Sequence, residues 1–153
     1  MVWPKTSTRP PLSPEIPVDL AGMYEKAALV LADSAEASAA MSRRCLQHLI
    51  RSKAGIKRPK LSQEIVGLVS TGALPSHLSE QLDAVRTIGN LAAHPEKDDV
   101  SGAVVEVEEH EAEWNLDVLD GLFDFYFILP AQTAARKAAL NAKLVALGKA
   151  PLK

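Results

Sequence analysis

The chain has 153 residues, of which 47% are hydrophobic, so it is long and apolar enough for one domain with a core and is not typical of a disordered protein. Its net charge of −2 does not predict nucleic-acid binding through bulk charge, so any such binding needs a local patch. The single cysteine, Cys45, excludes an intramolecular disulfide and a cysteine metal cage.

The remaining composition narrows the class of protein further. The four histidines lack the spacing of a metal site, so we expect no metal and no cofactor. The sequence shows no signal peptide and no apolar run long enough to span a bilayer, which favours a soluble cytoplasmic protein. Alanine is abundant while β-branched and aromatic residues are sparse, which predicts an all-α fold.

The first 18 residues contain five prolines and are predicted to be an extended tail rather than a helix. We interpret this tail as a linker in preference to a docking arm. The helical domain is then predicted over residues 19–147, and residues 148–153 form a short C-terminal tail.

Two helices are predicted next in the chain. Helical spacing of apolar residues indicates a helix over Asp19–Asp33, with its first residue as the N-cap. A second helix is capped by Ser34 and runs to about Lys53. Arg43 and Arg44 stand together in it, so we expect one to point inward and the other outward.

The middle of the chain contains a basic linker and two further helices. Residues 52–60, SKAGIKRPK, are either solvated surface or a phosphate contact. A third helix is predicted over residues 62–72, ending at a terminating glycine. Pro75 then begins a fourth helix. Residues 103–107 are predicted to be a short strand or an extended loop.

The last part of the chain is predicted to hold a fifth and a sixth helix. The acidic run Glu106–Glu113 is interpreted as the exposed start of the fifth, which ends near Ile128 and carries most of the aromatic residues. Pro130 is predicted to break or kink it, and residues 131–147 form the last helix. The prediction is therefore an up-and-down bundle of about five to six helices.

The fourth helix concentrates the chemistry of the chain. Arg86, Asn90 and His94 are spaced four residues apart, so on a helix they form one polar stripe about 12 Å long beside an apolar face. Pro95 disfavours helical backbone at His94, which places this histidine at the negative end of the helix dipole. A row of this kind grips a phosphate or moves a proton, so these three residues are the candidate catalytic or binding residues.

The same residues have a structural interpretation. Arg86 then pairs with a carboxylate, Asn90 bonds a neighbouring backbone, and His94 caps its own helix. Residue types alone do not separate this interpretation from a binding site.

Four stretches together resemble a bacterial family, domain of unknown function 4145. The stretches are YEKAALVLADS at 24–34, AAMSRRCLQHLI at 39–50, VRTIGNLAAHP at 85–95 and the aromatic helix ending in FILPAQ at Gln132. The resemblance covers roughly residues 19–143 and implies the HEPN superfamily, hence a HEPN-like helical bundle. Members of that superfamily include metal-independent ribonucleases of toxin and antiphage systems and inactive nucleic-acid-associated proteins, and they commonly dimerise with their motif helices facing.

The sequence departs from the pattern of the active members, which is an arginine, four to six residues, then a histidine, often with a polar residue after the arginine. Asn90 and His94 match the polar residue and the histidine, but Gly89 stands where the arginine is expected. Arg86 lies one turn earlier, and Gln47 stands where related sequences often have Glu. The cation that would stabilise a phosphorane is therefore displaced.

These departures favour a non-catalytic HEPN-like module in a defence or toxin–antitoxin setting. It would form a homodimer through the Leu82–His94 helix and bind RNA or another nucleic acid, a nucleotide or a protein partner, but no membrane. The alternative is a metal-independent endoribonuclease, with His94 as general acid or base, Arg86 holding the phosphate and Asn90 orienting it. In a third hypothesis the stripe only keeps the helices of an interaction domain in register.

Overall fold

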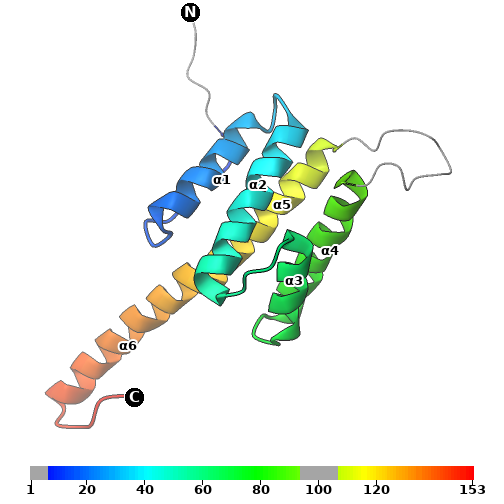
Figure 1. Cartoon of the computed structure of the whole chain (residues 1–153). Coiled ribbons are helices and arrows are strands. Elements are labelled where there is room, and N and C mark those ends of the chain that lie inside the picture. The colour runs from blue at the N-terminus through cyan, green and yellow to red at the C-terminus, as the bar shows by residue number, and fades with distance from the viewer. Residues whose placement is uncertain (1–6, 94–106) are drawn as a thin grey trace, which may run out of the picture.

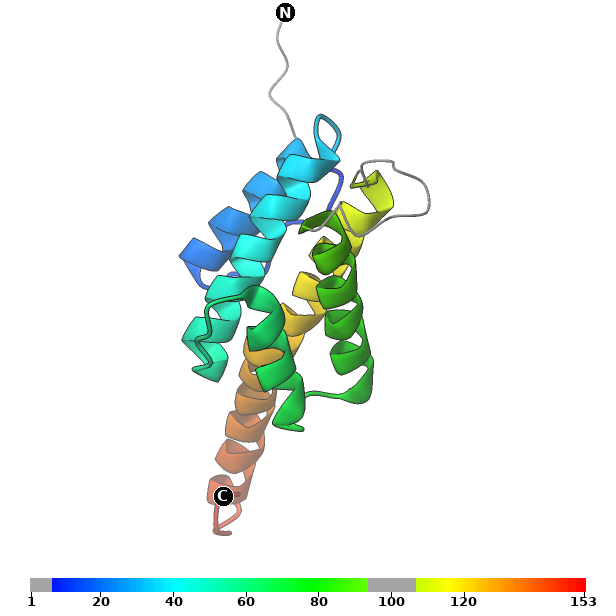
Figure 2. The ribbon, with the colours of Figure 1, turned by 45° about the vertical axis from the view of Figure 1, so that its right-hand side comes forward.

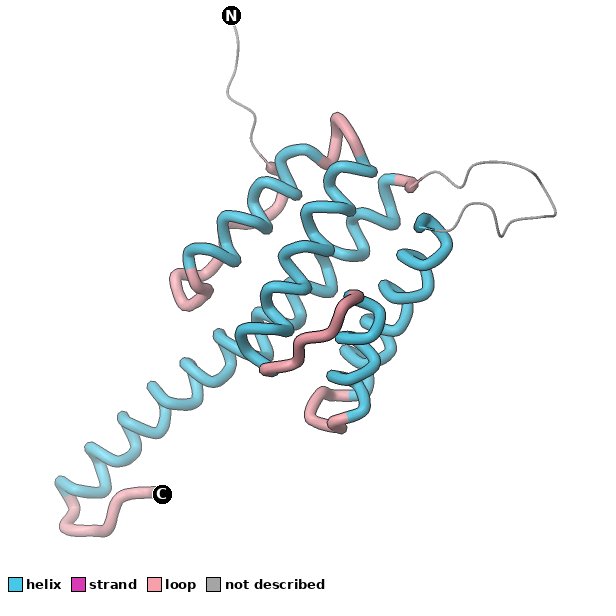
Figure 3. The backbone as a smooth tube through the Cα atoms, viewed as in Figure 1, coloured by secondary structure: helices cyan, strands magenta, loops and turns pink. Residues whose placement is uncertain are grey.

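The computed structural model describes residues 7–93 and 107–153, with side chains for residues 7–89 and 107–153. Every regular element in these ranges is helical, which confirms the all-α prediction (Figures 1 and 3). The elements are α1 (Val18–Val30), α2 (Ala35–Leu49), η1 (Ile50–Ala54), α3 (Leu61–Ser70), α4 (Ser76–Ala93), α5 (Glu109–Phe123), η3 (Asp124–Ile128) and α6 (Leu129–Ala146). Most of the predicted strand or loop at 103–107 lies outside the described residues.

The N-cap of α2 was predicted correctly from its local sequence, whereas that of α1 was not. Ser34 caps α2 as predicted, because its hydroxyl oxygen accepts a hydrogen bond from the backbone N–H of Ala37 at 3.1 Å. The prediction that Asp19 caps α1 was wrong, since Pro17 occupies the N-cap. The Asp19 carboxylate instead lies 2.6 Å from Nε2 of His48 on α2, and this hydrogen bond lowers the pKa of the carboxyl.

The core lies where α2 packs between α1 and α5, and α4 closes the bundle between α3 and α5 (Figures 1 and 2). Phe123 is its largest fully buried side chain, and its ring centroid lies 5.7 Å from that of Tyr24 on α1. Buried side chains come from α1, α2, α3, α4 and α5, and they include Leu20, Leu49, Ile65, Leu68, Leu82, Leu116, Leu119 and Leu122. Burial of aliphatic and aromatic area on this scale is the main term that stabilises the bundle.

The described part of the N-terminal tail lies against the bundle, while its role as a linker or a docking arm stays a prediction. Arg9 donates hydrogen bonds to the Tyr24 hydroxyl at 3.1 Å, to the Asp120 carboxylate at 3.0 Å and to the Asp117 carboxylate at 2.7 Å. Ile16 is buried in the core at the other end of the arm. Burial and the hydrogen bond with Asp120 raise the pKa of Tyr24, so the hydroxyl stays protonated.

Replacing Arg9 with alanine is expected to detach this arm. Because Arg9 is only 18% exposed and bonds three side chains, we expect the free energy of unfolding to fall by about 1 kcal/mol. Amide hydrogen exchange over residues 7–16 should become faster, while exchange in α2 stays slow. Arg136→Ala on the exposed α6 is the control. If residues 7–16 are equally protected from amide exchange in both variants, Arg9 does not hold the arm on the bundle.

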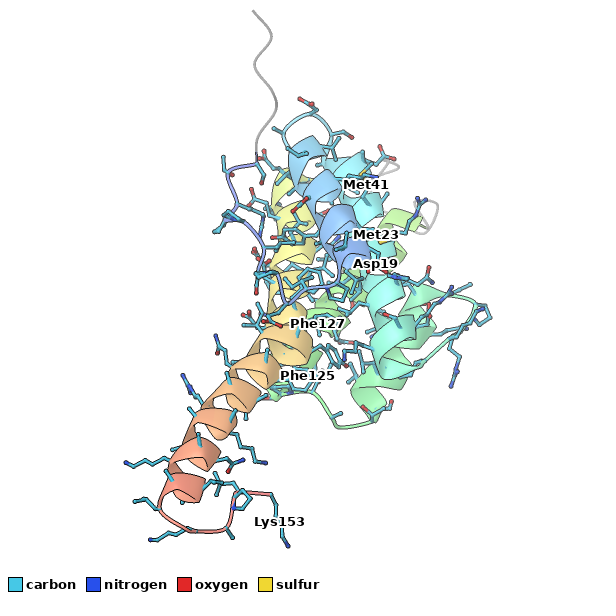
Figure 4. All side chains as sticks on the ribbon, turned by 90° about the vertical axis from the view of Figure 1, so that its left-hand side faces the viewer. Asp19, Met23, Met41, Phe125, Phe127 and Lys153 are labelled. Carbon is cyan, nitrogen blue, oxygen red and sulfur yellow. The ribbon has the colours of Figure 1, made fainter. Side chains whose placement is uncertain are left out.

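The chain continues from α5 through the π-helical turn η3 into α6 without a break, so of the predicted break or kink at Pro130 the break was wrong. At η3 the backbone N–H of Leu129 bonds the carbonyl of Asp124, five residues earlier. Pro130 stands at the second position of α6 and has no N–H to donate into this wider turn. Figure 4 shows α6 extending away from the bundle beyond Phe125 and Phe127.

No residue of α6 is buried, and within the described structure it packs mainly against η3. Leu129, Leu140 and Val145 are more than half exposed on it. None of the described helices combines the length and apolarity that crossing a bilayer requires.

Candidate functional site

Helix α4 is held in the bundle by one face, and its other faces carry the candidate site. Leu78, Leu82 and Val85 are buried at intervals of four and three residues, as an amphipathic helix requires. Trp114 on α5 donates a hydrogen bond from its indole to the Gln81 carbonyl at 3.3 Å, which ties α5 to α4.

Arg86 lies on the side of α4 that faces α3. Its Nε and Nη2 atoms both bond Oδ1 of Asp83, one turn earlier on the same helix, at 3.0 and 2.8 Å. The side chain is 32% exposed and lines a groove of about 320 Å³ together with Ser62, Gln63 and Val66 of α3. The groove therefore offers a guanidinium, a hydroxyl and an amide to a ligand.

The structure does not describe the side chains of the other two predicted site residues. Asn90 belongs to α4, but its side chain is outside the described part, and His94 lies outside the described residues altogether. Their approach to Arg86 stays a prediction. The segment is helical up to Ala93, as the predicted stripe requires.

A second guanidinium reaches α4 from α2. Arg43 is half-buried and donates a hydrogen bond from Nη1 to the Val85 carbonyl at 3.3 Å, whereas Arg44 is exposed. This confirms that one of the two arginines points inward. The guanidinium occupies the space beside Gly89 that a side chain there would fill. Burial lowers the pKa of Arg43, which nonetheless stays charged because arginine does not titrate near neutral pH.

A buried carboxylate links α2 to α3 behind the groove. The Glu64 side chain is fully buried, yet its oxygens accept hydrogen bonds from Nε2 of Gln47 at 2.6 Å and from Nε of Arg51 at 2.7 Å. Burial alone would raise the pKa of Glu64, but the bonds from Arg51 and Gln47 outweigh it and lower that pKa. A glutamate in place of Gln47 would set a second carboxylate against Glu64, so the amide at this position fits the network.

Two other groups of reactive side chains offer little chemistry. Cys45 is buried, and burial raises the pKa of its thiol to about 12, which suppresses the thiolate. Glu108, His110 and Glu111 have potential ligand atoms within 4.8 Å of one another at the start of α5. Both Glu108 and His110 are exposed and lie 3.2 Å apart, an arrangement common on acidic helix starts.

Sequence reasoning missed the roles of Arg43, Glu64 and Arg9. The paired arginines at 43 and 44 were a signal, but their helix partner was not apparent. Glu64 falls between Leu61 and Ile65 on the apolar face of α3, and a charged residue in that position signals a buried partner.

The model of one family, a domain of unknown function (DUF4145), matches residues 25–143. No curated protein and no solved structure matches the chain.

Proposed function

Because that match covers most of its length, the chain belongs to the DUF4145 family, and we propose that it is a non-catalytic, HEPN-like module that binds single-stranded RNA in the groove between α3 and α4. The observation that carries the proposal is that Arg86 lines this groove while the chain entering α3 is strongly basic. Lys57, Arg58 and Lys60 are exposed immediately before Ser62 and Gln63 of the groove.

The chemistry of the groove suits a phosphodiester backbone. Residues 51–60 contain no carboxylate and five cations, namely Arg51, Lys53, Lys57, Arg58 and Lys60. Because Arg51 is engaged with Glu64, the three exposed cations nearest α3 provide a local positive field that the chain as a whole, with its net charge of −2, lacks. Hydroxyl and amide donors of Ser62 and Gln63 bind phosphate and ribose oxygens without reading sequence.

A binding role is better supported than cleavage. Arg86 is already held by Asp83 and turned toward α3, and position 89, where the resemblance to active HEPN members expects an arginine, is glycine. The endoribonuclease hypothesis requires Arg86 to leave Asp83 and reach His94.

The expected result is that the wild-type chain binds fluorescently labelled single-stranded RNA and leaves it intact. Arg86→Ala should weaken binding about tenfold, the scale of one charge-assisted hydrogen bond. The slope of log K against log salt should fall by about 0.7, as expected for one lost contact to a single strand. Fluorescence anisotropy over a salt series measures both quantities.

Asp83→Ala distinguishes binding by Arg86 from a structural role of the ion pair. It frees the guanidinium, so RNA binding should stay equal or tighten, whereas a structural pair would make both variants bind weakly. Unchanged affinity of Arg86→Ala would contradict the proposal. RNA cleavage that is lost in His94→Ala would replace the proposal with the endoribonuclease.

We propose in addition that two copies pair through the Leu82–His94 helix, so that two grooves serve one RNA. Exposure of Asp83 and Thr87 on α4 leaves a face of this helix uncovered within the described structure. Light scattering should give the mass of a dimer. A monomer that still binds RNA would contradict the pairing of two copies but not the RNA-binding groove.

A further inference from the structure

Arg43 stands apart from the other arginines of the bundle. Four arginines are partly buried in the described structure, and three of them pair with carboxylates: Arg9 with Asp117 and Asp120, Arg51 with Glu64, and Arg86 with Asp83. Among the described residues, Arg43 bonds only the carbonyl of Val85, and no described carboxylate pairs with it. Its charge has been partly withdrawn from water without a counter-charge in the described part of the chain.

The surroundings hold the guanidinium in one place. A β-carbon added to Gly89 would overlap Nη1 and Cζ of Arg43, so the arginine lies in a space that exists only because residue 89 has no side chain. The guanidinium therefore sits at the surface of α4 as if it belonged to position 89, although it is delivered by α2. It is still partly exposed, so a ligand has access to it.

This arrangement is suited to an anion. Arginine has five N–H donors in a planar fork, and the single bond from Nη1 to Val85 leaves most of them for a ligand. A phosphate accepts two parallel hydrogen bonds from such a fork and returns the missing counter-charge. The guanidinium is also positioned in advance by α2 and α4, so little ordering is required on binding.

We propose that Arg43 is an anion-binding residue of the α4 face, and that its guanidinium, in the space left by Gly89, binds a phosphate group of the RNA ligand. The inference rests on the proposed function for the source of the phosphate, and on the contact between Arg43 and Gly89 for the site itself. The two cations beside the α4 face then come from different helices. Arg43 comes from α2, and Arg86 comes from α4 itself, on the side that faces α3.

The test compares Arg43→Ala with Gly89→Ala. Both should weaken RNA binding about tenfold and lower the salt slope by about 0.7, because each removes the guanidinium from this place. Gly89→Ala displaces only the tip of a flexible side chain, and alanine is the better helix former, so the melting temperature should be unchanged or higher. If Arg43 had only a structural role, loss of binding would come with loss of stability. Loss of RNA binding at an undiminished melting temperature therefore indicates a direct contact with the ligand.

Arg44→Ala is the matched control, since it removes an exposed arginine from the next position of the same helix. It should bind RNA nearly as the wild type does. Binding that is unchanged in Arg43→Ala, or lost equally in Arg44→Ala, would overturn the inference while leaving the proposed function in place.

Inorganic pyrophosphate gives a second readout that does not require RNA. It should raise the melting temperature of the wild type and of Arg44→Ala but not that of Arg43→Ala. If RNA fails to bind while this pattern holds, the proposed function is wrong and the anion site stands. If pyrophosphate and RNA both leave the wild type unaffected, the anion site is wrong as well.

Discussion

Replacing Arg51 with methionine is expected to lower the free energy of unfolding at pH 7 by about 3 kcal/mol, the scale for removing one partner of a buried ion pair. The Glu64 carboxylate is fully buried, and the Arg51 Nε bond at 2.7 Å provides its counter-charge. Without Arg51 the carboxylate keeps the bond from Gln47 but loses its charged partner. Urea denaturation followed by circular dichroism measures the change.

Two further variants separate the ion pair from simple packing. The double variant Arg51→Met with Glu64→Gln removes the charge and keeps an acceptor for Gln47, so it should recover most of the lost stability. Arg58→Met changes an exposed arginine of the same segment and should alter the free energy of unfolding by less than about 0.5 kcal/mol. Equal losses in the Arg51 and Arg58 variants would mean that the buried pair contributes nothing specific.

The same network predicts how stability depends on pH. The pKa of Glu64 is lowered in the folded chain from its ordinary value of 4.5, so the unfolded state binds its proton first as the pH falls. The stabilisation is therefore complete above about pH 4.5 and is lost as the pH falls through the folded pKa. In Arg51→Met the burial of Glu64 is no longer offset by a cation, so the pKa of its carboxyl rises, and the difference from the wild type should begin to shrink above pH 4.5 and keep shrinking as the pH falls.

Phe123→Ala is expected to lower the free energy of unfolding by about 3–5 kcal/mol, the usual cost of truncating a buried phenylalanine. The side chain is 1% exposed, and its ring contacts Tyr24 at 5.7 Å and Phe127 at 6.3 Å between centroids. Removing it opens a cavity where α1 meets the junction of α5 and η3. Calorimetry or urea denaturation measures the loss.

Phe125→Ala is the matched control, because it truncates the same residue type two positions further along the aromatic segment. Phe125 is half-buried beside Tyr126, so the cost should be less than half of that at Phe123. If the two variants lose the same stability, the core is not centred on Phe123. The aromatic segment is unevenly buried, since Phe123 is buried while Phe125, Tyr126 and Phe127 remain partly exposed.

Features set by neighbouring residues were predicted well. Ser34 caps α2 because its hydroxyl reaches an amide three residues away, and Gly72 ends the α3 segment because only glycine adopts its φ of 69° without strain. The burial of Leu82 and Val85 on the apolar face of α4 likewise follows from spacing along one helix. Membership of the DUF4145 family was indicated by motifs that the family match then covered.

Errors arose where a side chain meets a distant partner or where a helix changes its pitch. Asp19 was assigned a cap, but it bonds His48 on another helix. Pro130 was assigned a break or a kink, but the helix continues unbroken through the π-helical turn ahead of it. The candidate site divides in the same way. Arg86 lies on α4 and pairs with Asp83 one turn earlier, as spacing along one helix allows, but its direction toward α3 follows from packing.

The amino-acid order determined the helical class, most helix ends and the family, because capping, glycine conformation and apolar period act over a few residues of chain. Tertiary structure alone decided that Arg43 lies against Gly89, that Glu64 is buried with Arg51, and that Arg9 holds the N-terminal arm. The physical reason is that a buried charge is stabilised by the group that another helix packs beside it. Residue spacing along one helix does not reveal which group that is.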